Sequence, residues 1–159
     1  MAELYLLTPP RIDDAFAATL ARTLDAGPVS ALQIRLKDHD EADIRTLAPG
    51  LIEAAHGRGV TVIMNDDPQL ASALGCDGVH VGQSDATVKQ ARADLGPKAV
   101  IGATCHDSRH LAMLAGEQGA DYVAFGSVFE TATKTPKSRA PLELFSWWRE
   151  LFELPSVAI

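Results

Sequence analysis

A chain of 159 residues that is 47% hydrophobic is long enough to bury one sizeable core, and a single domain is expected. Its formal net charge of −7 argues against a general nucleic-acid or anionic-membrane surface, so any anion site must be local. Cys76 and Cys105 lie far apart without CxxC spacing, which indicates neither a zinc knuckle nor a disulfide framework. No basic region precedes an apolar core at the start, and no apolar run approaches roughly 18 residues, so a cytoplasmic protein is expected.

Short β-rich runs alternate with helix-like segments along the chain. Phe16, Leu20 and Leu24 recur at helical spacing, and such spacing gives a helix one apolar face. Several helices end at a glycine suited to the left-handed conformation: Gly59, Gly75, Gly96 and Gly119. Strands are expected at 4–8, 31–36, 60–65, 78–81, 99–103, 122–125 and 156–159, and helices at 13–26, 41–58, 68–74, 87–95, 108–118 and 142–152.

A weak internal repeat sharpens the fold prediction. GCDGVHVG (75–82) and GADYVAFG (119–126) share Gly-x-Asp-x-Val-x-x-Gly, and each ends at a glycine where backbone can approach a ligand closely. Repeated βα units without a GxGxxG after the first strand favour a (β/α)8 TIM barrel over a doubly wound sheet. Seven strands and six helices are counted, so one incomplete barrel domain over 1–159 is expected. Strand eight and its flanking helices would then lie in about 40 further residues.

In such a barrel the chemistry lies where strands end and βα loops begin. The second strand ends in QIRLK, where Gln33, Arg35 and Lys37 alternate with apolar residues and are expected to share one face. An amphipathic edge strand is the structural alternative. Three long polar groups pointing into a barrel need partners, and a charged substrate would supply them.

Carboxylates follow the third and fourth strands. The third ends in Asn65, Asp66 and Asp67, of which Asp67 is expected to cap the helix that opens at Pro68, leaving Asp66 as a metal candidate. The fourth ends in VHVGQSD, which adds Asp85. Two carboxylates at adjacent strand ends, opposite a cationic site, suit Mg²⁺ bound through few protein ligands plus substrate phosphates.

The fourth and fifth strands leave several alternatives. Ser84 or Asp85 could instead cap the helix expected from residue 87, and Asp107 or Ser108 the helix after that. Thr104 and His106, at the end of the fifth strand, are candidate ligand contacts, although a lone histidine is more often structural. His80, inside a strand, is interpreted as structural.

The loop after the sixth strand, GSVFETATKTPKSR (126–139), gathers hydroxyls and cations in an acidic chain. Thr131, Thr133 and Lys134 could contact a diphosphate whose other side faces Mg²⁺, with Arg35 and Lys37 nearby. A solvated basic loop is the alternative.

Together these stretches resemble the thiamine-phosphate synthase family. The shared motifs are Gln-x-Arg-x-Lys at 33–37, Asn-Asp at 65–66, Gly-Val-His-x-Gly-Gln-x-Asp at 78–85, Gly-x-[Ser/Thr]-x-His at 102–106 and the Gly-x-x-Phe-x-Thr-x-Thr-Lys pattern at 126–134. Thr104 stands where the family usually has Ser and keeps the hydroxyl. The family's Gly-Gly phosphate loop would begin beyond Ile159, so the thiazole-phosphate pocket is expected to be missing.

The resemblance implies a transferase of the thiamine-phosphate diphosphorylase type. It would join hydroxymethylpyrimidine diphosphate to thiazole phosphate, with Asp66 and Asp85 holding Mg²⁺, and it would need neither nucleic acid nor membrane as a partner. Early C–O cleavage would leave mainly the departing diphosphate charge to be stabilised. The resemblance assigns substrate contacts to Gln33, Arg35, Lys37, Asn65, Thr104, Thr131, Thr133 and Lys134, of which Arg35, Lys37 and Lys134 would be catalytic.

Two other functions stay open at this point. A thiazole tautomerase of the same superfamily would use an acid/base residue such as His106 in place of a metal. A non-catalytic relative would bind a phosphate ligand without turnover. Oligomerisation is also left open.

Overall fold

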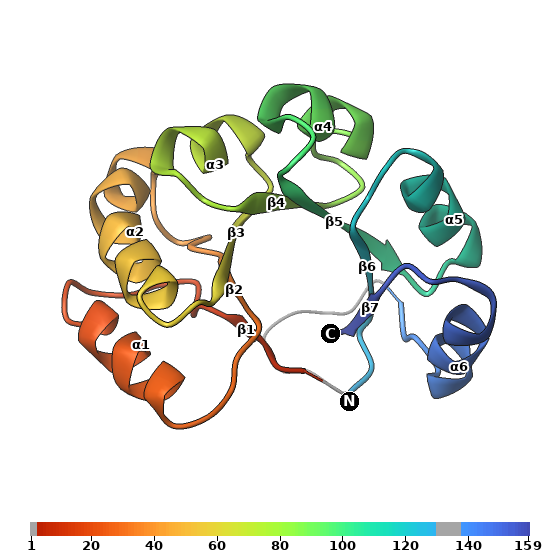
Figure 1. Ribbon diagram of the computed structural model, residues 1–159, viewed down its shortest axis with the longest axis horizontal. Coiled ribbons are helices and arrows are strands. Elements are labelled where there is room, and N and C mark those ends of the chain that lie inside the picture. The colour runs from red at the N-terminus through yellow and green to blue at the C-terminus, as the bar shows by residue number, and fades with distance from the viewer. Residues whose placement is uncertain (1–2, 130–137) are drawn as a thin grey trace. The chain divides into compact units, whose positions relative to one another are not determined.

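Strands and helices alternate along the whole of the computed structural model, which describes residues 3–129 and 138–159 (Figure 1). The strands are β1 (Tyr5–Leu7), β2 (Ala31–Ile34), β3 (Thr61–Asn65), β4 (Gly78–Val81), β5 (Val100–His106), β6 (Tyr122–Phe125) and β7 (Ser156–Ala158). The helices are α1 (Phe16–Asp25), α2 (Glu41–His56), α3 (Pro68–Leu74), α4 (Val88–Leu95), α5 (Arg109–Glu117) and α6 (Leu142–Leu151).

The strands pair in parallel within each half of the chain. The chain divides into two compact units, Met1–Val79 and His80–Ile159. In the first, β1 pairs with β2 and β2 with β3; in the second, β5 pairs with β6 and β6 with β7. The strand order follows the chain order, which confirms the predicted α/β fold of the TIM-barrel class. A further strand beyond the seventh stays a prediction.

Each unit has its own apolar core. In the first unit, Leu32 of β2 and Val62 of β3 are opposite each other and fully buried, and Leu51 of α2 is also buried. In the second, β6 is buried along its whole length, and Phe125 packs edge-on against Trp148 of α6 with ring centroids 5.7 Å apart. A strand buried on both faces reads as a continuous apolar run, which explains why YVAF was recognisable from sequence.

Two strands end more than one residue away from the expected position, and both ends lie beside candidate site residues. β2 ends at Ile34, because the next amide, that of Arg35, donates to the Thr8 hydroxyl at 2.8 Å and not to a backbone carbonyl. β5 continues to His106, whose backbone still pairs with Phe125 beyond a register shift. Arg35 and Lys37 therefore belong to a loop, while His106 belongs to a strand.

Helix starts and ends follow local side-chain chemistry. Asp67 accepts hydrogen bonds from the amides of Gln69 and Leu70, so its predicted capping role is confirmed. Ser108 caps α5 as predicted. The alternative in which Ser84 or Asp85 caps α4 is wrong: Thr87 immediately precedes the helix and accepts from its third residue. Positive φ angles occur at all four expected glycines, Gly59, Gly75, Gly96 and Gly119.

The internal repeat has a structural explanation. Its aspartates, Asp77 and Asp121, each accept a backbone N–H from the preceding strand at 2.7 Å, that of Val62 and of Ile101 respectively. The glycines that end the repeat make room for the chain itself. A Cβ at Gly82 would lie 2.7 Å from Asp85 Oδ2, and one at Gly126 would lie 2.5 Å from Ile159.

Candidate functional site

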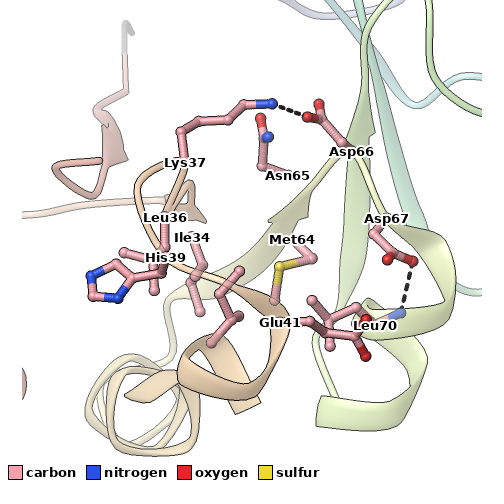
Figure 2. A pocket seen from close by; sticks show the side chains of 11 residues that line it. Ile34, Leu36, Lys37, His39, Glu41, Met64, Asn65, Asp66, Asp67 and Leu70 are labelled. Carbon is pink, nitrogen blue, oxygen red and sulfur yellow. Dashed lines mark hydrogen bonds and ion pairs between the residues drawn. The ribbon is translucent and has the colours of Figure 1, made fainter. Parts of the chain in front are cut away.

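The polar ends of β2 and β3 meet at a pocket of about 220 Å³ in the first unit (Figure 2). Lys37 Nζ forms an ion pair with Asp66 Oδ2, and Figure 2 shows the lysine extending to that carboxylate above the Asn65 amide. The two paired side chains are 46% and 29% exposed, so both stay accessible to a ligand. The structure thus brings together three of the residues predicted from sequence.

Asp66 has an unusual backbone conformation. Its φ is +67°, in the left-handed region that non-glycine residues seldom adopt. Within the described residues, the other non-glycine position of this kind is His106, with φ +54° at the end of β5. Asp66 directly follows β3 and His106 is the last residue of β5, and polar candidates were expected at both strand ends. Strained backbone conformations of this kind cluster at functional sites, so the φ of Asp66 supports its assignment as a site residue.

The pocket has an apolar floor and a polar rim. Ile34, Leu36, Met64 and Leu70 form the floor. His39 lies at one side, where its Nε2 accepts the Ile12 N–H at 3.1 Å; Nδ1 therefore carries the proton of the neutral ring and donates to Asp43 Oδ2. This histidine ties the segment before α1 to the first turn of α2, and sequence inspection gave no hint of it.

Gln33 and Arg35 are placed differently from Lys37. Gln33 is 4% exposed, and its Nε2 donates to the Tyr5 hydroxyl at 3.3 Å. Arg35 is half-buried just after the strand, and its amide is held by Thr8. Because β2 ends at Ile34, the three residues do not continue one alternating strand face as the sequence suggested.

The second unit holds the other candidates. Asp85, in the loop between β4 and α4, accepts the Gly82 N–H at 2.8 Å. Thr104 of β5 has its hydroxyl 2.8 Å from His80 Nε2, and its carbonyl accepts from Gln83 Nε2 at 2.5 Å. His80 Nδ1 lies 2.9 Å from the Tyr122 hydroxyl. His80 is 7% exposed and bonded at both nitrogens, in line with its structural interpretation.

Three candidates fall outside the part of the chain that the structure describes, and the two cysteines add no reactive group. Thr131, Thr133 and Lys134 lie outside the described residues, and their roles stay predictions. Burial raises the pKa of the Cys76 and Cys105 thiols to about 12, so neither is an ionised nucleophile at neutral pH.

The donor atoms at the site suit Mg²⁺. Mg²⁺ takes oxygen ligands, and is usually held by one or two carboxylates with water and substrate phosphate completing the octahedron. Asp66 offers an accessible carboxylate beside the Asn65 amide oxygen. Across the described ranges there is no group of three or more His, Cys, Asp or Glu side chains placed to hold a metal. A magnesium ion here would therefore depend on few protein ligands.

Sequence inspection gave no role to three residues that organise these sites. Tyr122 and Gln83 hold His80 and Thr104, and Thr8 ends β2. Gln83 and Tyr122 lie inside motifs already noted, the first in VHVGQSD and the second in the repeat. Their roles depend on hydrogen bonds to residues of other strands, and the sequence does not show these contacts.

These features define an α/β enzyme of the TIM-barrel class, with charged and amide side chains at the carboxyl ends of its strands. The chain belongs to the family described as thiamine monophosphate synthase, whose sequence profile matches residues 4–159.

Named relatives cover nearly all of the chain. It is 54% identical to the thiamine-phosphate synthase of Rhodospirillum centenum, over 98% of this chain and 76% of that protein. It is 47% identical to that of Erythrobacter litoralis, over 99% and 76%. A solved thiamine phosphate pyrophosphorylase from Pyrococcus furiosus is 28% identical, with a TM-score of 0.84 over 99% of this chain and 74% of that one. Among the helices that the structure describes, none has the length and hydropathy to cross a bilayer.

Proposed function

We propose that this chain takes part in the synthase reaction of its family and holds the site for its pyrimidine diphosphate. Hydroxymethylpyrimidine diphosphate would be joined to a thiazole phosphate, giving thiamine phosphate and free diphosphate. The observation that carries this proposal is the cluster of Lys37, Asn65 and Asp66 at the ends of β2 and β3, beside an apolar pocket floor. A cation, an amide and a carboxylate are the groups needed to hold a diphosphate and its metal ion.

The proposed roles are those that the family resemblance implies. Lys37, Arg35 and Asn65 would bind diphosphate oxygens, since two are cations and the amide can donate. Gln33 would help to orient the pyrimidine diphosphate. Thr104 would contribute a hydroxyl contact, and Thr131, Thr133 and Lys134 would bind where the two substrates meet.

Asp66 and Asp85 are the proposed magnesium ligands. When bound, Mg²⁺ would neutralise charge that develops on the departing diphosphate. Lys37 pairs with Asp66 in the structure, so it lies close enough to the proposed metal ligand to bind the same diphosphate. Charge stabilisation of this kind needs no strong base.

The bond changes are simple. The C–O bond between the pyrimidine methylene and the diphosphate breaks, and the electron pair leaves with diphosphate. The thiazole nitrogen then forms the new C–N bond through its lone pair. The chain's own residues bind and orient the diphosphate, and Lys37, Arg35 and Lys134 would offset its growing negative charge.

The relatives named above favour the synthase over the tautomerase alternative. We also infer small-molecule substrates, with neither nucleic acid nor membrane as a partner, and a cytoplasmic location. Homo-oligomer formation stays open.

The test is a product assay with both substrates, in the presence and absence of Mg²⁺. Thiamine phosphate that forms only with Mg²⁺ supports the synthase. Magnesium-dependent binding of pyrimidine diphosphate without any product would identify a non-catalytic relative. Conversion of thiazole phosphate without pyrimidine diphosphate would identify the tautomerase.

A further inference from the structure

Three polar side chains form a continuous hydrogen-bonded chain across three strands of the second unit. Tyr122 of β6 meets His80 of β4 at 2.9 Å, and His80 meets Thr104 of β5 at 2.8 Å. His80 and Tyr122 are each 7% exposed, whereas Thr104 is half-buried. Thr104 is therefore the more accessible end, where a ligand can meet the chain.

The tyrosine reaches the histidine because of a glycine. A Cβ built at Gly102 would lie 1.9 Å from a ring carbon of Tyr122. That distance is too short for any side chain at this position. The phenol ring fills that space and lies with its centroid 5.5 Å from the His80 ring. Gln83 holds the Thr104 carbonyl at the same time, so both the backbone and the hydroxyl of Thr104 are fixed.

The direction of the hydrogen bonds decides what Thr104 can offer. A neutral imidazole has one nitrogen that donates and one that accepts. A phenol is a stronger acid than an aliphatic hydroxyl and hence the better donor, so Tyr122 is expected to donate to Nδ1. Nε2 then carries the proton and donates to Thr104 Oγ1, which leaves the threonine O–H free to donate elsewhere.

We propose that His80 is a positioning residue that fixes the Thr104 hydroxyl as a hydrogen-bond donor to the substrate. Tyr122 sets the tautomer of His80, and His80 sets the direction in which Thr104 donates. The ligand group that Thr104 meets is an acceptor, such as a diphosphate oxygen or a ring nitrogen of the pyrimidine. This inference rests on the proposed function, because it assumes that Thr104 contacts the pyrimidine diphosphate.

The first test reads the tautomer directly and does not depend on activity. The chain is labelled with ¹⁵N at histidine, and the His80 signals are assigned by their loss in His80→Gln. Protonated Nε2 and unprotonated Nδ1 are expected in the wild-type chain, with a shift toward the other tautomer in Tyr122→Phe. A proton on Nδ1, or on both nitrogens at neutral pH, would overturn the proposal.

The second test uses calorimetry with pyrimidine diphosphate and Mg²⁺. His80→Leu and Thr104→Val should each weaken binding by about 10-fold, the loss of one hydrogen bond. Thr104→Ser keeps the hydroxyl, and the His80→Gln amide can accept from Tyr122 while donating to Thr104, so both should bind within about threefold of wild type. If His80→Leu does not fold, Tyr122→Phe replaces it in the same binding measurement.

The double variant separates positioning from packing. If His80 acts through the hydroxyl, His80→Leu with Thr104→Val should bind no more weakly than Thr104→Val alone. Additive losses would overturn the positioning role. Failure of the wild-type chain to make product, with these binding results intact, would count against the synthase reaction and leave the role of His80 standing.

Discussion

Lys37 and Asp66 form an ion pair across the carboxyl ends of two adjacent parallel strands. Neither residue lies inside a strand: Lys37 comes three residues after β2 ends, and Asp66 directly follows β3 with φ +67°. The pair therefore depends on two loop conformations, which the sequence motifs alone did not reveal. Its partial exposure means that it contributes little to stability and stays available to a ligand.

Lys37→Ala should change ligand binding far more than stability. A partly exposed ion pair is worth less than about 1 kcal/mol, while a charge-assisted contact to diphosphate corresponds to roughly 10- to 100-fold in affinity. Calorimetry with pyrimidine diphosphate and thermal melting would measure the two effects. Arg45→Ala, which removes an exposed pair with Glu41, is the matched control and should alter neither property greatly. Equal binding by Lys37→Ala and wild type would contradict the proposed role.

Arg35 and Lys134 are expected to meet the same anion. Replacing either with Ala should weaken diphosphate binding by about 10-fold or more, with little change in melting temperature, since neither is assigned to packing. Lys98→Ala removes an exposed lysine beyond the end of α4 and serves as the control. A large fall in melting temperature without a specific binding defect would show that these cations stabilise the fold and do not bind the anion.

Asp121→Ala should destabilise the chain without affecting the binding site. Its carboxylate accepts the N–H of the buried Ile101 at 2.7 Å and also pairs with Arg92. Leaving that amide unsatisfied should cost about 1–3 kcal/mol, measured by denaturant unfolding. Asp94→Ala, on the exposed side of α4, should cost less than about 0.5 kcal/mol. If Asp121→Ala has the same free energy of unfolding as wild type, solvent satisfies the Ile101 amide.

Gly102→Ala should displace Tyr122. The added methyl would overlap the phenol ring, and overpacking of this kind typically costs about 1–3 kcal/mol. The His80 tautomer should become less well defined in the same variant, because the phenol would move away from Nδ1. Gly59→Ala tests a glycine with φ +69° and open space around it, so it separates backbone strain from steric overlap. An unchanged melting curve for Gly102→Ala would mean that the strands shift to accommodate the methyl.

Most elements could be predicted from the sequence because their signals are local. β4, β6 and α3 match their expected bounds, since each is a short apolar run bounded by glycine, proline or a capping aspartate. The errors came where a residue distant in sequence decides the outcome. Thr8, just after β1, accepts the amide that follows β2, and the backbone pairing with Phe125 extends β5.

The same distinction holds for the candidate site. Residue type and position at strand ends identified Lys37, Asn65 and Asp66. Tyr122, by contrast, is recognisable only once its ring is placed against Gly102 and His80, a contact between residues far apart in sequence.

Asp66 and Asp85 are expected to share one Mg²⁺, directly or through water. Asp66 follows β3 and Asp85 follows β4 along the chain, and Mg²⁺ with a diphosphate suits one or two carboxylates. Asp66→Asn and Asp85→Asn should each abolish most of the magnesium-dependent gain in pyrimidine diphosphate affinity. If one ion is shared, the double variant should lose no more than either single variant, because the ion is already lost.

The control for that experiment is the neighbouring carboxylate. Asp67→Asn keeps an N-capping side chain for α3 and should retain the magnesium-dependent gain, since Asp67 is engaged by the amides of Gln69 and Leu70. Binding is measured with and without Mg²⁺ for each variant, so that loss of a direct diphosphate contact is separated from loss of the ion. Independent, additive losses for Asp66 and Asp85 would show that the two carboxylates act at different places.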